Sequence, residues 1–276
     1  SALNKYLYCQ KQFYYRYVMG IHEPPKEEDI VASGQTIGNV LHHIMQQLYV
    51  PFEKKNVTSS DLRTMIDSLT EDRWQSLLSE LEGDILAMQI TKSYVRNILL
   101  YDMTRAPFFY EGSECVVKRD LQVPDLGTFH FLGYIDRLDK RDGMLNIIDY
   151  KTGGAELEFK DMAHVFHRSK NQDKALQTLL YCWMIQYSLP ELLTDHSEMV
   201  PHIYPVRSMA KTEAVQTLIC AKGVADFSFT PEVETEFVEG MTNLLQEIFN
   251  PEIPFVATTE CSTRCKSCAF IGLCKG

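Results

Sequence analysis

The sequence predicts an α/β fold in which helices flank a mixed sheet. Helical periodicity dominates the chain before residue 105, three strand-like segments follow in hairpin succession, and a helix and a further strand come next. This order corresponds to an αβββαβ core. Hydrophobic residues make up 45% of the 276 residues, which is enough for a substantial core. We therefore expect a single domain over residues 1–276.

The first part of the chain is predicted to be helical. Residues 1–18 are rich in aromatic side chains and favour a short helix, and a loop containing two prolines follows them. Apolar side chains recur at helical spacing over residues 37–48. Segments 59–82 and 84–105 are typical of two further amphipathic helices. We expect these last two helices to form a helical insert over residues 51–106.

Strand patterns begin after this helical region. A proline and a glycine separate the first two strands, and the Asp142-Gly143 pair is a hairpin signal before the third. A helix, a fourth strand and a last long helix follow. The predicted strands are residues 108–121, 128–139, 144–150 and 199–207, and the predicted helices are residues 172–188 and 231–249.

Charge and hydropathy exclude some classes of protein. The formal net charge is -10, which argues against a nonspecific nucleic-acid coat protein but not against a nuclease, whose active-site carboxylates add negative charge. No apolar run approaches the roughly 20 residues of a membrane helix, and no secretion signal is visible. We therefore expect a cytoplasmic protein without membrane contact. The chain lacks a starting Met, so we expect a processed product or a piece of a longer protein.

The segment between residues 133 and 154 carries the most informative side chains. Asp149 and Lys151 are two apart on a predicted strand, so they share one face. Asp136 lies near the end of the preceding strand, and the Asp142-Gly143 turn would bring it beside Asp149. Two carboxylates suit Mg²⁺ or Mn²⁺, and an adjacent lysine can orient a water or stabilise charge on a phosphate. This is the equipment for metal-assisted phosphodiester hydrolysis.

The same pattern has a simpler interpretation. An isolated Asp-x-Lys is usually an ion pair on an exposed strand. Here Asp149 follows an apolar Ile-Ile pair, and the chain leaves the strand through Gly153 and Gly154, as a site-forming loop would. The neighbouring residues therefore favour a functional site over a surface ion pair.

These residues resemble a known family. Gly133-Tyr134-Ile135-Asp136-Arg137 followed by Ile148-Asp149-Tyr150-Lys151-Thr152-Gly153 is similar to the RecB-like branch of the PD-(D/E)XK nucleases, which includes RecB, AddA, AddB and the CRISPR-associated exonucleases. The resemblance implies a restriction-endonuclease-like core, in agreement with the αβββαβ order. Further matching features are Gly38-x-x-x-His42, Glu114, Gln177-x-x-x-Tyr181 and the cysteines near both ends.

The resemblance implies a role for each matching residue. His42, Asp136 and Asp149 would bind the metal together with the Tyr150 carbonyl, and Lys151 would be the catalytic lysine. Gln177 and Tyr181 would position substrate or brace the site. Glu114 is as readily a solvated carboxylate at a strand edge as a site residue. Periodicity does not choose between His42 and His43, and His42 is preferred because Gly38 precedes it by one turn. An imidazole ligand would favour Mn²⁺ over Mg²⁺.

The eight cysteines fall into two groups. Cys115, Cys182 and Cys220 are interpreted as small buried hydrophobic residues. Cys9, Cys265, Cys268 and Cys274 resemble the set that binds a [4Fe–4S] cluster in AddB-type nucleases, and would join the termini, residues 1–18 and 255–276, in a clasp. The match departs at Gln10, where the family often has Pro. Alternatively, Cys261 with the three later cysteines could hold zinc, or the cysteines could be free or oxidised.

The expected function is that of a Mg²⁺- or Mn²⁺-dependent deoxyribonuclease, an exonuclease rather than an endonuclease. The resemblance implies the nuclease domain of a helicase–nuclease in DNA repair, with DNA and a helicase segment or subunit as partners. A phosphate-loop motif is absent from this chain, so any motor lies elsewhere. Two alternatives are a free-standing CRISPR-type exonuclease and a catalytically silent DNA-binding or scaffold module of the same fold.

Overall fold

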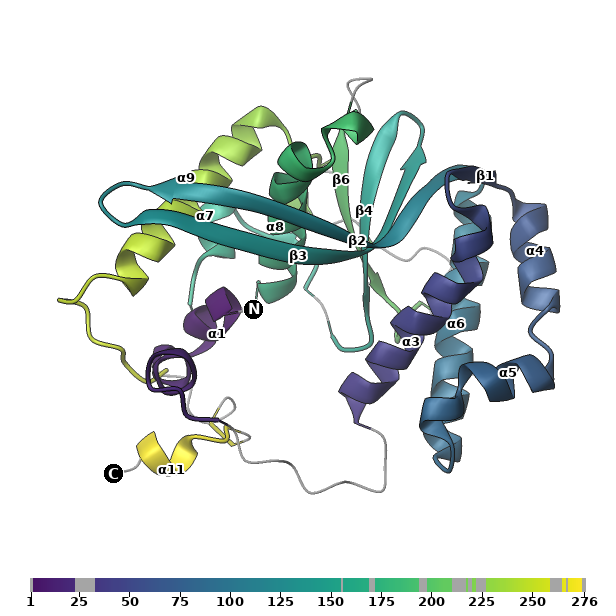
Figure 1. Ribbon diagram of the computed structural model, residues 1–276, viewed down its shortest axis with the longest axis horizontal. Helices are drawn as coiled ribbons and strands as arrows, with labels where there is room; N and C mark the ends of the chain where they lie inside the picture. Colours follow the sequence, from purple (N-terminus) through teal and green to yellow (C-terminus); the bar gives the residue numbers. More distant parts are fainter. Residues whose placement is uncertain are drawn as a thin grey trace.

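The computed structural model has a five-stranded mixed sheet flanked by helices, as predicted (Figure 1). The strand order is β1-β2-β3-β4-β6; β4 and β6 are parallel and the other neighbours are antiparallel. The strands are β1 (Lys55–Val57), β2 (Phe108–Val123), β3 (Gly127–Arg141), β4 (Met144–Lys151) and β6 (Met199–Pro205). The structure describes residues 2–22, 33–154, 156–168, 172–193, 198–209, 217, 220–221, 227–258, 265–266 and 268–274.

Helices cover both faces of this sheet. The longer ones are α3 (Gly34–Tyr49), α4 (Ser59–Asp67), α5 (Glu71–Leu77), α6 (Ile85–Arg105), α8 (Asp173–Ser188) and α9 (Pro231–Ile248). The shorter ones are α1 (Ala2–Tyr8), α2 (Gln10–Phe13), α7 (Met162–Val165) and α11 (Ile271–Cys274). A small second sheet pairs β5 (Glu158–Phe159) with β7 (Cys220–Ala221). No helix in the described ranges is long and apolar enough to cross a membrane.

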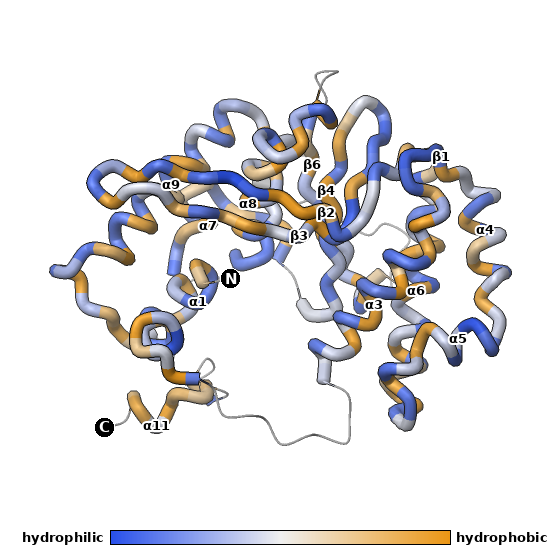
Figure 2. The backbone as a smooth tube through the Cα atoms, viewed as in Figure 1, coloured by the Kyte–Doolittle hydropathy of each residue, from blue (hydrophilic) through white to orange (hydrophobic). Residues whose placement is uncertain are grey.

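Two hydrophobic clusters lie on opposite faces of the sheet. One contains Ile147 of β4 together with buried residues of α1, α8 and α9. The other contains Ile148 and Tyr150 of β4 together with buried residues of α3 and α6. Hydrophobic segments gather at the centre of the sheet, and hydrophilic ones are more frequent toward the outer helices (Figure 2). Because β4 is covered on both sides, Asp149 is buried although it is charged.

Several elements differ from the prediction. The expected helix over residues 1–18 is broken at Cys9, whose backbone is extended (φ -162°, ψ 113°). The expected helix over 59–82 divides where Thr70 caps α5 with its side chain. Within residues 51–106 the structure adds the short strand β1, which pairs with β2. The assignment of this region as an insert stays a prediction.

The β2–β3 hairpin shifts register between Tyr110 and Gly112, and an irregular position that matters for the site follows at Glu114. Ser113 pairs with Arg137 and Cys115 pairs with Ile135, so Glu114 lies opposite Asp136. Glu114 has φ +50°, which is uncommon for a residue with a side chain and typical of strained functional sites. Beyond this position the hairpin leaves the sheet as a long arm that runs toward α9 (Figure 1).

A partly buried histidine on β6 makes the stability depend on pH. His202 Nε2 lies 3.0 Å from Asn146 Oδ1 and its Nδ1 lies 3.0 Å from Thr217 Oγ1. Burial, with a smaller contribution from the Arg105 guanidinium, lowers the pKa of His202 to about 3. The unfolded pKa is about 6.5, so the unfolded chain takes up a proton first as the pH falls. We expect this residue to lower the free energy of unfolding between pH 6.5 and 3, by at most about 1.4 kcal/mol per pH unit.

Denaturant unfolding of the parent chain and of two variants at pH 4.5 to 7.5 measures this effect. His202→Gln should give a shallower loss of stability toward acid than the parent chain. His130→Gln, at an exposed histidine, is the control for the substitution itself. Equal slopes for all three proteins would contradict the assignment.

Candidate active site

Three elements meet where the β3–β4 ladder ends. The Tyr150 amide donates a hydrogen bond to Asp136 Oδ2 at 2.7 Å. His42 Nε2, from α3, lies 3.1 Å from the Tyr150 carbonyl oxygen and 3.4 Å from Asp136 Oδ2. The structure therefore brings together three of the predicted metal-binding groups. His43 points elsewhere and pairs with Gln47 at 2.6 Å, so the preference for His42 agrees with the geometry.

The strained residue Glu114 belongs to the same group. His42, Glu114 and Asp136 each offer one ligand atom, and these atoms lie within 4.8 Å of one another. In the described part of the chain, no other group of three His, Cys, Asp or Glu side chains meets this criterion. The left-handed backbone of Glu114 and its place opposite Asp136 bring its carboxylate there. The interpretation of Glu114 as a solvated edge carboxylate is therefore less favoured than a role in the site.

Asp149 and Lys151 share one face of β4, as their spacing predicts. Lys151 Nζ lies 2.6 Å from Asp149 Oδ2, and the Lys151 side chain keeps 19% of its exposure while Asp149 keeps 1%. Asp149 Oδ1 is buried and has no hydrogen-bond partner among the described residues. A buried carboxylate oxygen without a donor is costly. Such an oxygen is suited to a cation that arrives from solution.

The electrostatics of the site point the same way. Burial, and next the Asp149 carboxylate, raise the pKa of Asp136 well above its usual range, and Lys151 opposes the effect only in part. Glu114 adds further negative charge nearby. The site therefore holds more carboxylates than cations. Oxygen ligands with one imidazole suit Mg²⁺ or Mn²⁺, so the residues present fit the predicted ion.

Gln177 and Tyr181 lie beside these carboxylates on α8. Gln177 Nε2 donates to Tyr181 Oη at 2.7 Å, because their i, i+4 spacing places them on one face of α8. Burial and the nearby Asp149 raise the pKa of Tyr181, so its hydroxyl stays protonated and can donate a hydrogen bond. The pair therefore borders the site, close enough for Asp149, Asp136 and Glu114 to act on the Tyr181 hydroxyl.

Gly133 has a role that the sequence motif did not assign. A Cβ at this position would lie 2.8 Å from Tyr181 Cε1 and 2.7 Å from Met184 Cε, closer than real atoms approach. We expect Gly133→Ala to displace the Tyr181 ring and to lower cleavage by about 10-fold or more. Gly154→Ala is the matched control, since nothing lies within 4 Å of its Cβ. Nuclease rates and melting curves of both variants measure the effect; equal rates would contradict it.

Cys9 and Cys274, one from each end of the chain, lie near Tyr15. Its hydroxyl donates to the Leu273 carbonyl oxygen at 3.1 Å, and its ring lies 5.7 Å from that of Phe270. Burial, followed by Cys274 and to a smaller extent Cys9, raises the pKa of Tyr15. Cys9 and Cys274 are 265 positions apart in the sequence, and both lie close enough to Tyr15 to affect its pKa. None of the six cysteines whose side chains the structure describes forms a disulfide, and Cys261 lies outside the described residues.

These cysteines do not show the spacing of a closed zinc site. Sulfurs on tetrahedral zinc lie about 3.8 Å apart at a Zn–S distance of about 2.3 Å. In the described ranges no three cysteine sulfurs lie within 4.8 Å of one another. Of the cysteines interpreted as hydrophobic, Cys182 is buried and Cys115 is only partly so, and the side chain of Cys220 is outside the described part.

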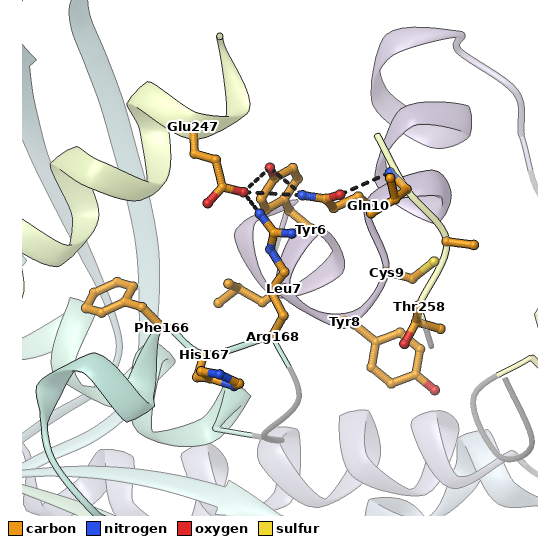
Figure 3. A pocket seen from close by; sticks show the side chains of 12 residues that line it. Tyr6, Leu7, Tyr8, Cys9, Gln10, Phe166, His167, Arg168, Glu247 and Thr258 are labelled. Carbon is orange, nitrogen blue, oxygen red and sulfur yellow. Dashed lines mark hydrogen bonds and ion pairs between the residues drawn. The ribbon is translucent and has the colours of Figure 1, made fainter. Parts of the chain in front are cut away.

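Gln10, where the resemblance departs from the family pattern, ties the two ends of the domain together. Gln10 Oε1 accepts from the Val256 amide at 3.0 Å, and Nε2 donates to Tyr6 Oη at 2.7 Å and to Glu247 Oε1 at 3.2 Å. Arg168 pairs with Glu247 in the same pocket of about 440 Å³, where Cys9 lies beside Thr258 (Figure 3). A glutamine therefore fixes the segment that carries Cys9.

A comparison with known families agrees with this fold. The family model described as the PD-(D/E)XK nuclease superfamily matches residues 1–275. No curated protein matches the chain. The match covers the αβββαβ core, both strands of the carboxylate–lysine site and the cysteines at either end. The chain therefore belongs to the PD-(D/E)XK nuclease superfamily.

Proposed function

We propose that this chain is a divalent-metal-dependent nuclease that hydrolyses phosphodiester bonds in DNA. The observation that carries the proposal is the convergence of His42, Glu114, Asp136 and the Tyr150 carbonyl around one point beside the Asp149–Lys151 pair. Three carboxylates with one imidazole and one lysine are the groups that metal-assisted hydrolysis needs. A catalytically silent module has no physical need for this costly buried charge.

Each side chain has a task in this proposal. Asp136, Asp149, Glu114, His42 and the Tyr150 carbonyl would hold the ion, which when bound supplies positive charge at the phosphate and lowers the pKa of water. The partly exposed Lys151 reaches the solvent side of the site. Its ammonium orients the attacking water and stabilises the negative charge that develops on the phosphate. The Tyr181 hydroxyl, held by Gln177, braces the substrate side.

A nuclease assay tests the proposal directly. The purified chain is incubated with labelled DNA in Mn²⁺, in Mg²⁺ and in chelator. We expect cleavage with either ion, faster with Mn²⁺ because His42 offers a nitrogen ligand, and none in chelator. Cleavage that persists in chelator, or an absence of cleavage under every condition, would overturn the proposed function.

We propose further that the enzyme is an exonuclease and acts within a helicase–nuclease. The support is the resemblance of its motifs to the RecB-like branch. Linear and circular single strands of equal sequence distinguish the modes. Degradation of the linear substrate alone supports an exonuclease, and cleavage of the circle identifies an endonuclease. Stimulation by a purified helicase partner and ATP would support the wider context.

A second cofactor is proposed for the cysteines near both ends. We propose that Cys9, Cys265, Cys268 and Cys274 bind a [4Fe–4S] cluster with a structural role. The support is the proximity of Cys9 and Cys274 to Tyr15 and the attachment of the Cys9 segment to Val256 by Gln10.

Anaerobic purification with metal analysis tests this second proposal. We expect about four iron atoms per chain and a brown colour. Cys9→Ser should lose the iron, and the control Cys115→Ser should keep it. Zinc that is retained by Cys9→Ser would instead identify a site that uses Cys261, and would overturn the cluster.

A further inference from the structure

Four charged side chains are buried behind the candidate active site, on the face of the sheet that α3 and α6 cover. Asp102 and Arg105 come from α6, and Arg137 and Asp139 from β3; we call these four residues the ion quartet. Arg137 Nη1 donates to Asp102 Oδ2 and Nη2 to Asp139 Oδ2, both at 2.6 Å. Arg105 Nη2 donates to Asp139 Oδ1 at 3.0 Å. Two positive and two negative charges thus balance.

Arg137 is held more completely than a surface arginine can be. It keeps 1% of its exposure, and its guanidinium carbon lies 4.6 Å from the ring centres of both Tyr49 and Phe108. Both carboxylates that it binds are fully buried. Rings of this kind favour a cation, and the two carboxylates fix its orientation. Arg137 therefore has one orientation available to it.

The position of Arg137 in the ladder links the quartet to the metal site. Arg137 and Ile148 are the last residues that pair before β3 and β4 separate. The residue just before Arg137 on β3 is Asp136, which is not paired with β4 and accepts a hydrogen bond from the Tyr150 amide with its side chain. Arg137 Nη1 also donates to Tyr150 Oη at 3.4 Å. The Arg137 guanidinium therefore contacts Asp139, in the paired part of β3, and Tyr150, in the part of β4 beyond the last pair with β3.

Stability alone does not account for such a group. Replacing a buried ion network by apolar residues of similar volume is often neutral or stabilising, because desolvation offsets the attraction between the charges. Apolar contacts are not directional, so an apolar core does not by itself hold the backbone of a strand to within about 0.5 Å. Metal ligands need that accuracy, and residues that orient ligands commonly alter metal affinity 10- to 100-fold.

We propose that Arg137, through the ion quartet and Tyr150, is the positioning residue of the metal site. It fixes β3 and β4 at their last pair, so that the Asp136 carboxylate, the Tyr150 carbonyl and His42 meet. This inference rests on the proposed function for the identity of the ion. It assigns a role to a side chain that lies on the opposite face from Asp149 and Lys151 and contacts no substrate.

A Mn²⁺ titration tests the inference without any cleavage assay. Electron paramagnetic resonance measures the free ion and so gives the binding affinity. Arg137→Lys keeps the charge but loses the two-pronged contact, and we expect it to bind Mn²⁺ about 10-fold more weakly. Tyr150→Phe removes only the Oη contact with Arg137 and keeps the ion quartet. It therefore still tests the inference if Arg137→Lys does not fold. We expect it to weaken Mn²⁺ binding at least 2-fold.

The control is Arg119→Lys, in the other hydrophobic cluster. Arg119 stacks on Trp183 at 4.6 Å and pairs with Glu234 at 3.0 Å, so this variant loses similar contacts far from the metal ligands. It should lower the melting temperature and leave Mn²⁺ affinity unchanged.

The outcomes separate this inference from the proposed function. Wild-type affinity in both Arg137→Lys and Tyr150→Phe, or an equal loss in Arg119→Lys, would overturn the positioning role while DNA cleavage stands. Mn²⁺ binding that follows the expected order in a chain that cuts no DNA would support the positioning role and overturn the nuclease. A wild-type chain that binds no Mn²⁺ would overturn both.

Discussion

Replacing Lys151 with alanine is expected to lower the rate of Mn²⁺-dependent DNA cleavage by about 100- to 1000-fold. The Lys151 ammonium is the cation of the site that remains partly exposed, and it lies 2.6 Å from Asp149 Oδ2. The variant removes the charge that stabilises the developing oxyanion but leaves His42, Asp136 and the Tyr150 carbonyl in place. Mn²⁺ should therefore still bind, and the loss should fall on kcat rather than on metal affinity.

Lys160→Ala provides the matched control for charge. Lys160 is exposed and has only a long ion pair of 3.8 Å with Asp161. The two variants change the net charge equally, so a loss confined to Lys151→Ala cannot come from weaker general attraction to DNA. Single-turnover cleavage with saturating Mn²⁺ gives the comparison. Lys151→Ala within a few fold of the parent chain would exclude a catalytic role for this lysine.

Asp136→Asn is expected to act in opposite directions on activity and on stability. Cleavage should fall by at least about 1000-fold, because the ion loses a central ligand. The metal-free variant should nevertheless melt at a higher temperature than the metal-free parent at pH 8. Burial and the neighbouring Asp149 raise the pKa of Asp136 in the folded chain, so stability falls as the pH rises above the unfolded pKa of about 3.9 and the full cost is present above the raised pKa. The amide avoids this cost, and its oxygen can still accept the Tyr150 amide.

Melting curves with and without Mn²⁺ distinguish the two effects. Mn²⁺ should raise the melting temperature of the parent chain and have little effect on Asp136→Asn, so the order of stability reverses when the ion is added. The advantage of the metal-free variant should also disappear below pH 4, where the Asp136 carboxyl is protonated in both folded and unfolded chains. Asp120→Asn, at an exposed carboxylate, should show neither effect. A metal-free Asp136→Asn that is less stable at pH 8 would contradict the electrostatic account.

Local patterns were sufficient for the part of the site that lies on β4. The two-residue spacing of Asp149 and Lys151 places them on one face wherever that strand packs. The Asp142-Gly143 turn, with positive φ at both residues, sets the register that brings Asp136 to the end of the ladder. The choice of His42 over His43 needed the family resemblance, because both flank the apolar stripe of α3.

Other features depend on tertiary contacts that no local pattern contains. The left-handed backbone of Glu114 arises where the hairpin leaves the sheet, so sequence left its role open. Arg137 and Asp139 look like ordinary exposed strand charges until α6 supplies Asp102 and Arg105. The strand β1 was missed because its three residues are too few for periodicity and two of them are exposed. The break at Cys9 follows an aromatic segment with no proline or glycine to indicate it.

The alternation of side chains along β4 also governs how the domain loses its structure. Ile147 belongs to the cluster under α8, and the next residue, Ile148, belongs to the cluster under α3 and α6. Unfolding of either cluster would expose one face of β4 to water and remove the packing that supports its parallel pairing with β6. Both halves are thereby bound into one cooperative unit, so unfolding on either side would take the candidate site with it.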